Sequence, residues 1–585
     1  MAIAVHEIRP VAHLPLVLGM LRKLEVRAVI DTLCPPHPDN VVSCGRGVEA
    51  LVLAILDGDH ALYKVGQRLD ERGIFPLLQA GLRRESLNDY RLGQILDALF
   101  AANLNQVFGA VALKALNVYA RPTLWIHQDT TTIRLYGAYD GLPEPRAQEA
   151  DKVTGPLAPR PAHGYSKDGR PDLKQVLLSL GVSGDGGLPL RLGLRDGNSS
   201  DSTETPIAIE ECLALGLQGV LGIVADSKAY SQRTLGLCLE RQIGLVTRVP
   251  RTCAIRQELE AWGQQQDVLP LLLEKPGRTQ QEPPRRWRGQ SVLRHIDVED
   301  ADGNIHQAEL RFLVVHSSSL AQQETKAAAT ARAKEAERVD AHQQHVAAQS
   351  YACAADAEAA IAVYEGRAPG HRGRRPQLWR YHTLRYRVEA FSQRQKRASR
   401  GRPAKAELPQ MEQRYRVVVD VEPLGGGQAE EGWTVLATTV GGEVCTDAEI
   451  LRAYHDQHST VEPGFRWIKN PAAIAPVWLE KPERIAALAM LTVVGLLVYA
   501  LIQQQVRLYL HEQHQVLPGN KGLTTTPTAA VIFSLFTPVM LVQLMVDSTP
   551  VPHIYGVQPH HLMICDALGL DRVWYAVPSH QENSA

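Results

Sequence analysis

The first 120 positions of the chain carry apolar residues at three- and four-residue spacing. Residues 45–58, 61–72 and 87–116 repeat this pattern, with glycine and asparagine residues between them. Side chains three or four positions apart lie on one face of a helix, so each segment presents an apolar face. The pattern predicts a small helical domain over residues 1–120.

From about residue 121 the apolar period changes. Residues 121–137, 172–183 and 188–198 are short apolar or alternating runs that end in turn residues, which is typical of strands. A helix, a strand, a helix and a strand are then predicted at residues 203–216, 220–226, 229–242 and 244–250. Strands followed by strand–helix alternation predict an α/β layer with a mixed sheet, whose first part is residues 121–250.

The pattern changes again after Pro250. Residues 291–318 indicate a β-hairpin and a further strand, and an alanine-rich, charged helix follows at about 320–365. Strands return before residue 440. These features describe a β-rich insertion over residues 251–440.

The α/β pattern resumes after this insertion. A helix is predicted to begin near Thr446 or Asp447, either of which can accept a hydrogen bond from the first helical turn. Residues 441–545 are therefore expected to form the second part of the α/β core, and residues 546–585 a C-terminal tail.

One segment, residues 486–502, is seventeen residues long and contains no charge. It could cross a bilayer, but it is at the short end of the range that spans hydrocarbon. Buried helices of large α/β proteins have the same composition. We expect a core helix here and no membrane partner.

The bulk composition limits the class of protein. A chain of 585 residues is too long for one compact core. Its 8 cysteines include no CxxC pair, which argues against a disulfide framework and a finger-type zinc site. The N-terminus lacks the pattern of a secretion signal. These features predict a cytoplasmic location.

Charge is balanced over the whole chain and unbalanced locally. A net charge of −1 argues against a nucleic-acid partner, but residues 365–405 contain thirteen Lys or Arg against two acids. Such a stretch favours phosphate groups. Within it, Arg400 and Arg402 resemble a hook that inserts into the DNA minor groove, and a solvated basic loop is an equal alternative.

Two aspartates follow predicted strands. Asp129 comes after "TLWIHQ" and Asp226 after "GIVA". Both therefore lie where a buried strand reaches the sheet edge, which is where α/β folds gather their chemistry. The alternative for each residue alone is a cap on the next turn or helix.

A glutamate lies among cations and aromatic residues in "YHDQHSTVEPGFRWIKNP", residues 454–471. Helical spacing would place five of these side chains on one face: Tyr454, His458, Glu462, Arg466 and Lys469. An amphipathic surface helix has the same arrangement, so this segment alone does not assign a function.

Taken together, Asp129, Asp226 and Glu462 resemble the DDE triad of cut-and-paste insertion-sequence transposases. The resemblance extends through "HQDTTTIRLYGAY", "HGYSKDGRPDLKQVLLSL", "DGNSSDSTE", "VADSKAYS" and "LVTRVP". The 236-residue gap between Asp226 and Glu462 is similar to the subgroup with a large β-rich insertion there. The resemblance implies a ribonuclease-H-like core and an N-terminal helical domain that binds DNA ends.

The resemblance also implies a reaction. The three carboxylates would be catalytic ligands of two Mg²⁺ ions, for which Mn²⁺ can substitute, because hard cations prefer oxygen ligands. The partners would be the terminal inverted repeats of a bacterial insertion sequence and a target DNA, bound by a homodimer. A ribonuclease-H-like nuclease that does not join strands, and an inactive DNA-binding relic, are the alternatives.

The signature of this subgroup has a tyrosine, an arginine, the glutamate and a lysine. Tyr454, Glu462 and Lys469 match it in kind, and His458 stands in the place of the arginine. We expect these neighbours of Glu462, together with Arg466, to contact DNA. Pro463 disfavours α geometry at the preceding residue, so the helix is expected to restart there.

Three further features have weaker interpretations. Trp287, in "RRWRG", could stack on a displaced base, although packing inside the insertion is the favoured interpretation. The residues "HHLMIC" at 560–565 lack a second ligand pair for zinc. The residues "GDGGLP" at 184–189 lack a P-loop lysine and predict a hairpin turn.

Overall fold

The computed structural model describes most of the chain. The described residues are 3–79, 81–119, 124–139, 157–166, 169–216, 219–277, 279, 282–366, 379–394, 411–424, 432–469, 479–546 and 549–572. They divide into two compact units. Unit 1 contains residues 1–257, 291–313 and 435–585, and unit 2 contains residues 258–290 and 314–434.

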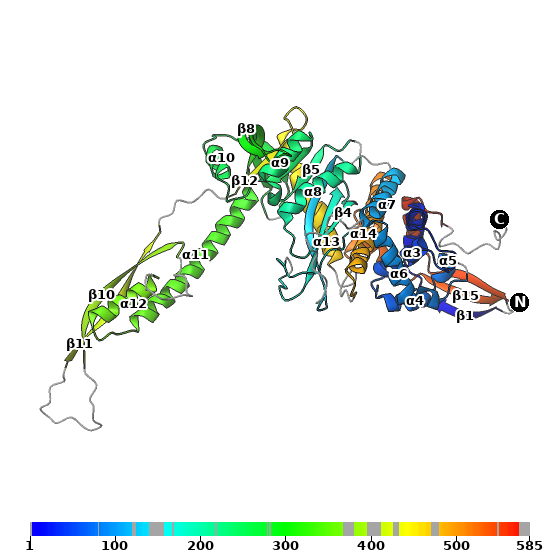
Figure 1. Cartoon of the computed structure of the whole chain (residues 1–585), viewed down its shortest axis with the longest axis horizontal. Coiled ribbons are helices and arrows are strands. Elements are labelled where there is room, and N and C mark those ends of the chain that lie inside the picture. The colour runs from blue at the N-terminus through cyan, green and yellow to red at the C-terminus, as the bar shows by residue number, and fades with distance from the viewer. Residues whose placement is uncertain are drawn as a thin grey trace, which may run out of the picture. The chain divides into compact units, whose positions relative to one another are not determined.

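A nine-stranded mixed sheet forms the α/β core, with the order β4-β3-β2-β5-β6-β12-β9-β8-β7 (Figure 1). Strands β2 (Trp125–Arg134), β3 (Gln175–Ser183) and β4 (Pro189–Arg195) are antiparallel neighbours. Strands β5 (Gly222–Ala225) and β6 (Gly244–Arg248) then run parallel to β2. Three antiparallel strands followed by two parallel ones is the ribonuclease-H-like order, so the predicted fold class is confirmed.

Helices cover both faces of this sheet. Gln128 bonds to Ser179 and Arg191, and Arg191 in turn pairs with Glu204 of α8 (Asp201–Ala214). The next residue, Asp129, shares a pocket with α13 (Asp447–Ile468). Consecutive residues of a strand point to opposite faces, so α8 and α13 lie on opposite sides. Helix α9 (Gln232–Glu240) connects β5 to β6.

The N-terminal helices are confirmed, and one strand precedes them. The helices are α1 (Leu14–Lys23), α2 (Val26–Leu33), α3 (Cys44–Leu56), α4 (Leu62–Glu71), α5 (Phe75–Leu78), α6 (Asp89–Ala101) and α7 (Leu104–Tyr119). Strand β1 (Ile3–Arg9) pairs with β15 (Met540–Val546), which the helical periodicity did not reveal. These helices share one hydrophobic core with β2, β3 and α14.

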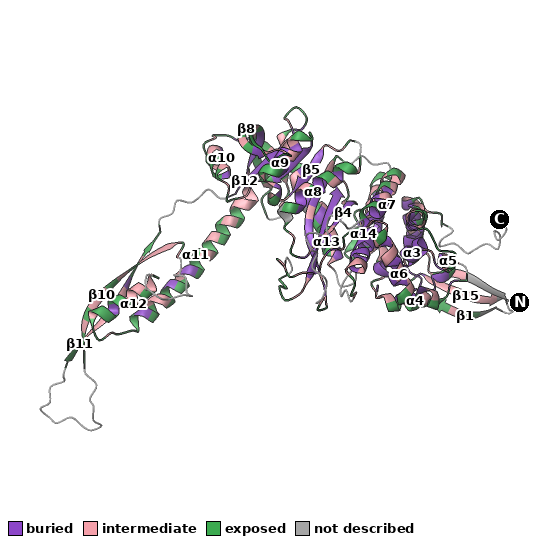
Figure 2. Cartoon of the chain, in the orientation of Figure 1, coloured by how far each residue is buried: buried purple, intermediate pink, exposed green. Residues whose placement is uncertain are grey.

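Helix α14 (Pro482–Glu512) contains the uncharged segment and lies at the centre of that core (Figure 2). It is long and apolar enough to cross a membrane, and 94% of its most apolar window is buried inside the protein. The pair α6 and α7 would pass the same test only as one span bent by 89°. Packing against α3, α6 and α7 explains why α14 is apolar on every side.

Unit 2 carries most of the predicted insertion. It includes β7 (Leu271–Lys275) and two helices, α11 (Ser318–Ala347) and α12 (Ala354–Tyr364). These two helices replace the single helix that was predicted at about 320–365. Strands β10 (His382–Arg394) and β11 (Met411–Pro423) form a separate hairpin with its own small core. The second half of β8 (Arg285–Glu299) and the first part of β9 (Ile305–Ser317) belong to unit 1.

The described part of the predicted C-terminal tail, residues 546–585, contains secondary structure. Strand β16 (Thr549–Tyr555) pairs with β15, and α16 (Pro559–Leu568) packs against α14. Between α14 and β15 lie β13 (Leu517–Gly519), β14 (Gly522–Thr524) and α15 (Ala529–Leu535). Strand β16 contains Pro550 and Pro552, which weakened the strand pattern in the sequence.

Candidate active site

The two aspartates are neighbours across parallel strands. In the register of β2 and β5, Gln128 lies opposite Ala225, so the residues that follow them, Asp129 and Asp226, are also adjacent. Strands in a sheet are about 4.8 Å apart. The positions of both carboxylates therefore follow from the pairing of two short strands, as expected for residues at a sheet edge.

Arg248 lies next to the two aspartates, on the following strand of the sheet. Ala225 lies opposite Thr247 of β6, so Arg248 lies beside Asp226 in the next strand. The Arg248 side chain is exposed. The sequence interpretation did not single out this residue, although "LVTRVP" was predicted to be a strand ending at the same edge. A search for charged residues at the ends of all parallel strands would have found it.

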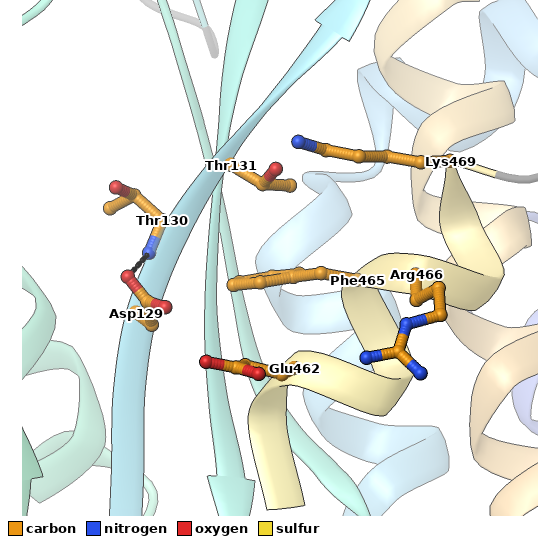
Figure 3. A pocket seen from close by; sticks show the side chains of 7 residues that line it. All are labelled: Asp129, Thr130, Thr131, Glu462, Phe465, Arg466 and Lys469. Carbon is orange, nitrogen blue, oxygen red and sulfur yellow. Dashed lines mark hydrogen bonds between the residues drawn. The ribbon is translucent and has the colours of Figure 1, made fainter. Parts of the chain in front are cut away.

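Glu462 approaches Asp129 from α13. Figure 3 shows the Glu462 carboxylate pointing toward Asp129 across a pocket. The pocket has a volume of about 670 Å³ and is lined by Asp129, Thr130, Thr131, Glu462, Phe465, Arg466 and Lys469. Phe465 is buried and forms its apolar wall, whereas Arg466 is exposed and Lys469 ends the helix.

Helix α13 is fixed at its start. Thr446 and Glu449 form a reciprocal capping box, which confirms Thr446 as the cap. The buried Arg311 donates from Nη2 to Asp447 Oδ1 at 2.6 Å, and Ser291 Oγ donates to the same oxygen at 2.5 Å. These bonds hold the first turn of the helix that carries Glu462.

The middle of α13 is held by other contacts. Gln457 Nε2 donates to the carbonyl oxygen of Gln128, the residue before Asp129, at 3.4 Å. The helix continues through Pro463 to Ile468, so the expected restart at Pro463 does not occur. A proline inside a helix removes one backbone hydrogen bond, and the surrounding packing compensates for that loss here. Glu462 is therefore a helical residue.

Each aspartate makes a local hydrogen bond. The backbone N–H of Thr130 donates to Asp129 Oδ1 at 2.7 Å, and the N–H of Lys228 donates to Asp226 Oδ1 at 3.0 Å. The second bond caps the short helix Ser227–Ala229. Asp226 thus caps a helix and also lies beside Asp129. Its role as a cap does not prevent its carboxylate from contributing to the site.

Tyr454 lies in the electrostatic field of this site. Burial raises the pKa of its hydroxyl, the nearby Arg248 and Arg256 lower it, and the carboxylates of Asp226 and Asp129 raise it. Its proximity to both aspartates agrees with its place in the predicted face of α13. The backbone of His458 is helical, and its side chain is outside what the structure describes.

Of the three remaining predicted DNA contacts, the structure describes Trp287. Trp287 is 7% exposed and lies in β8 opposite Leu273, which favours packing over stacking on a base. Arg400 and Arg402 lie outside the described residues.

A buried network lies behind Asp129 on the other face of the sheet. Arg191 donates from Nη1 to Ser179 Oγ at 2.6 Å and pairs with Glu204 at 2.7 Å. Arg195 of the same strand also binds Glu204, at 2.7 Å. A buried charge is tolerated when it is paired and hydrogen-bonded, so this network stiffens β2 through Gln128.

The donor atoms of the site suit a hard divalent cation. Asp129 and Asp226 directly follow the paired residues Gln128 and Ala225, and Asp129 faces Glu462 across the pocket. Carboxylate oxygens are the ligands that Mg²⁺ prefers. Among the residues that the structure describes, three such side chains do not converge on a single point.

Comparison with known proteins defines the family. The profile of a transposase DDE domain matches residues 129–499, and that of a domain of unknown function, DUF4277, matches residues 6–113. The chain belongs to the DDE transposase family. No curated protein matches it.

A solved structure shows weaker similarity to this DDE transposase. The piggyBac transposase synaptic complex with hairpin DNA is 9% identical, with a TM-score of 0.23. The match covers 50% of the present chain and 60% of that chain. The ribonuclease-H-like assignment of this transposase therefore rests on its own strand order.

Two other sequence features have structural roles in the transposase. The buried His561 forms a reciprocal cap with Gln558 at the start of α16, and its Nε2 lies 2.8 Å from the oxygen of Leu535. Residues 184–188 form the turn between β3 and β4, which confirms the predicted hairpin.

Proposed function

We propose that this DDE transposase cuts DNA at the ends of a bacterial insertion sequence and joins the freed ends to target DNA. The observation that carries the proposal is the placement of Asp129 beside Asp226, with Glu462 facing Asp129 across the pocket. Asp129 lies in β2 and Asp226 directly follows the adjacent parallel strand β5, and the glutamate faces Asp129 from a helix that is anchored separately.

The proposed reaction is phosphoryl transfer without a covalent enzyme intermediate. Asp129, Asp226 and Glu462 would hold two Mg²⁺ ions, or Mn²⁺, which supply charge stabilisation to an in-line displacement. Water would attack the phosphorus atom, and the bond to the 3′ oxygen of the element end would break. In strand transfer the freed 3′-hydroxyl would attack a target phosphate and displace its 3′ oxygen.

Cationic residues around the carboxylates would bind and orient the DNA backbone. Arg466 and Lys469 line the pocket beside Glu462, and Arg248 lies beside Asp226. Guanidinium and ammonium groups form charge-assisted hydrogen bonds with phosphate oxygens. The cations therefore lie on two sides of the carboxylates, where a scissile phosphate would need support.

The proposed partners are the terminal inverted repeats and a target DNA. A homodimer would hold two element ends together, and the reaction would take place in the cytoplasm. The N-terminal helical region would contribute to end binding. A nuclease that cuts without joining has the same carboxylates, so a strand-transfer assay with precut ends separates the two activities.

The test uses Asp129→Ala, Asp226→Ala and Glu462→Ala, with the inverted repeats beside the protein's own gene as substrate. Each variant should lose cleavage by at least about 1,000-fold and retain end binding, because a metal ligand and not a phosphate contact is removed. Asp456→Asn is the matched control, because Asp456 is an exposed carboxylate on the same helix.

Normal cleavage by Glu462→Ala in Mg²⁺ would contradict the assignment of the third carboxylate. Loss of binding together with cleavage would indicate misfolding, which circular dichroism would reveal independently. Cleavage without joining of precut ends by the wild-type protein would establish the nuclease alternative.

A further inference from the structure

A second cavity lies among the N-terminal helices, within the region matched by the domain of unknown function. Its volume is about 560 Å³, which is within the usual range of small-ligand sites. It is lined by residues of α1, α2 and α3 and of the junction between α1 and α2: Arg22, Glu25, Arg27, Ala28, Asp31, Arg46 and Glu49.

The floor of this cavity is a buried ion pair. Arg46 is 6% exposed and Glu49 is fully buried, and Arg46 Nη1 lies 2.5 Å from Glu49 Oε2. Burial raises the pKa of Glu49 even though arginines surround it. Replacing a buried ion pair by apolar residues is often neutral or stabilising, so stability alone does not account for charges here.

Each partner of this pair has one unpaired polar atom. Arg46 Nε, a donor, and Glu49 Oε1, an acceptor, make no hydrogen bond within the described residues. Buried polar atoms are nearly always paired, and an unpaired one destabilises the fold. Both residues line the cavity, so a ligand edge with one acceptor and one donor that reached these atoms would satisfy both.

The mouth of the cavity is exposed and has a different character. Arg22, Glu25, Arg27 and Ala28 are all exposed there. Glu25 pairs with Lys114 at 2.7 Å, and Asp31 accepts hydrogen bonds from Ser43 and from the backbone of Gly45. Arg22 and Arg27 bring guanidinium groups to the opening, where Arg22 donates to the carbonyl oxygen of Leu77 and Arg27 Nε lies 3.5 Å from Asp31 Oδ2.

We propose that this cavity binds one unpaired nucleotide of DNA, with the base on the floor and its phosphate at the mouth. Nucleobase edges place acceptors beside N–H donors, and guanine offers an acceptor oxygen with two N–H groups next to it. A carboxylate takes the N–H groups and a guanidinium takes the oxygen. This inference rests on the proposed function, since it assigns DNA as the ligand.

The balance of charge favours a nucleotide over a bare phosphate. Formally three arginines and three acids line the cavity, so the site as a whole has little net attraction for an anion. A neutral base on the floor and one phosphate near the two outer arginines match this distribution. The aliphatic stems of Arg22 and Arg27, with Ala28, offer apolar contact to the flat faces of a base.

The experiment measures binding of three fluorescent duplexes that share one arbitrary sequence. One carries an unpaired guanine, one an unpaired thymine and one an abasic site at the same position. The wild-type protein should prefer the unpaired guanine over the abasic duplex by about tenfold. Glu49→Gln should abolish that preference, because the carboxylate acceptor is replaced by an amide of the same shape.

Two further variants separate the floor from the mouth and from general stability. Asp57→Asn is the matched control, because Asp57 is a buried carboxylate, 1% exposed, that pairs with Arg68 and Arg72 away from the cavity. It should keep the preference. Arg27→Gln, at the exposed mouth, should weaken binding of all three duplexes and leave the ratio between them unchanged.

Equal binding of the guanine and abasic duplexes by the wild-type protein would overturn the proposal. If Glu49→Gln fails to fold, hydrogen exchange of the wild-type protein decides: the guanine duplex should protect α2 and α3 and the abasic duplex should not. If the protein cleaves inverted repeats normally but shows no preference for the unpaired guanine, this inference is wrong and the proposed function stands. Cleavage that survives loss of the triad would remove the proposed function alone.

Discussion

At the scale of single residues, Arg248 is the addition that the structure makes to the predicted site. Its place beside Asp226 comes from strand register and from no motif in the sequence. Three cationic side chains therefore lie near the carboxylates. Arg248 comes from strand β6, and Arg466 and Lys469 come from the end of helix α13.

Replacing Arg248 by glutamine should slow cleavage. If the guanidinium stabilises the phosphate in the transition state, kcat should fall by about 100-fold with a smaller change in KM. Arg241→Gln is the matched control, because Arg241 is an exposed arginine at the end of α9. Steady-state cleavage of a labelled inverted repeat gives both constants, and an unchanged kcat would leave Arg248 as a surface residue.

A second residue-scale prediction concerns pH. Burial lowers the pKa of His13 to about 4, and its ring stacks on Phe533 with centroids 4.3 Å apart. As pH falls, His13 binds a proton near pH 6.5 in the unfolded chain but not in the folded chain. The free energy of unfolding is therefore highest above pH 6.5 and decreases as pH falls toward 4. The loss should approach about 3 kcal/mol.

Chemical denaturation at pH 7.5 and pH 5 measures this effect. His13→Gln should have a smaller difference in unfolding free energy between the two pH values than the wild-type protein. His37→Gln, at an exposed histidine, should match the wild-type difference. An identical pH dependence in His13→Gln would show that folding does not lower the pKa of His13.

At the scale of elements, the turn between β3 and β4 supports the helix that carries Glu462. Gly187 has φ of +66°, and a Cβ atom there would lie 2.7 Å from the carbonyl oxygen of Thr460, two residues before Glu462. Gln504 of α14 donates to the carbonyl oxygen of Asp185 at 2.8 Å and holds the same turn. The glycine thus permits a close approach that fixes α13.

Gly187→Ala should displace α13 or the turn and reduce cleavage by at least about tenfold, while DNA binding stays near normal, because catalysis needs precise placement of the carboxylates. Gly169→Ala is the matched control. Gly169 has φ of +69° and open space around its Cβ position, so it carries the same backbone strain without the clash. Equal cleavage by the two variants would mean that the turn does not position Glu462.

At the scale of the whole molecule, the basic stretch of residues 365–405 is less uniform than its composition suggests. In the β10–β11 hairpin, Arg385 pairs with Glu422, Arg387 with Asp420, and Arg416 with Glu389. Opposite charges on adjacent strands neutralise each other locally. The hairpin therefore has less attraction for DNA than the sequence predicted.

The salt dependence of DNA binding tests this distribution. Arg400→Gln combined with Arg402→Gln should flatten the slope of log affinity against log salt by about one unit for each phosphate that the protein no longer neutralises. Arg385→Gln combined with Arg387→Gln should leave the slope nearly unchanged, because those arginines already have partners. Equal slopes for the two double variants would contradict a specific role for the 400–402 segment.

Much of the fold could be predicted because periodicity reports burial on one face. The N-terminal helices and strands β2 to β6 were found in this way, and so was the cap at Thr446. Strand β1 was missed because its partner β15 lies over 500 residues away, and the continuity of α13 through Pro463 was missed because local sterics argue against it. In both cases tertiary contacts override the local preference.

The amino-acid sequence by itself determined the order of the elements, the apolar character of α14 and the three carboxylates of the family motif, because these depend on residue type and local spacing. Only the tertiary structure decided that Arg248 joins Asp226, that the arginines of the hairpin are paired and that Arg46 and Glu49 form a cavity floor. Those facts depend on strand register and on packing between distant segments, which no local pattern encodes.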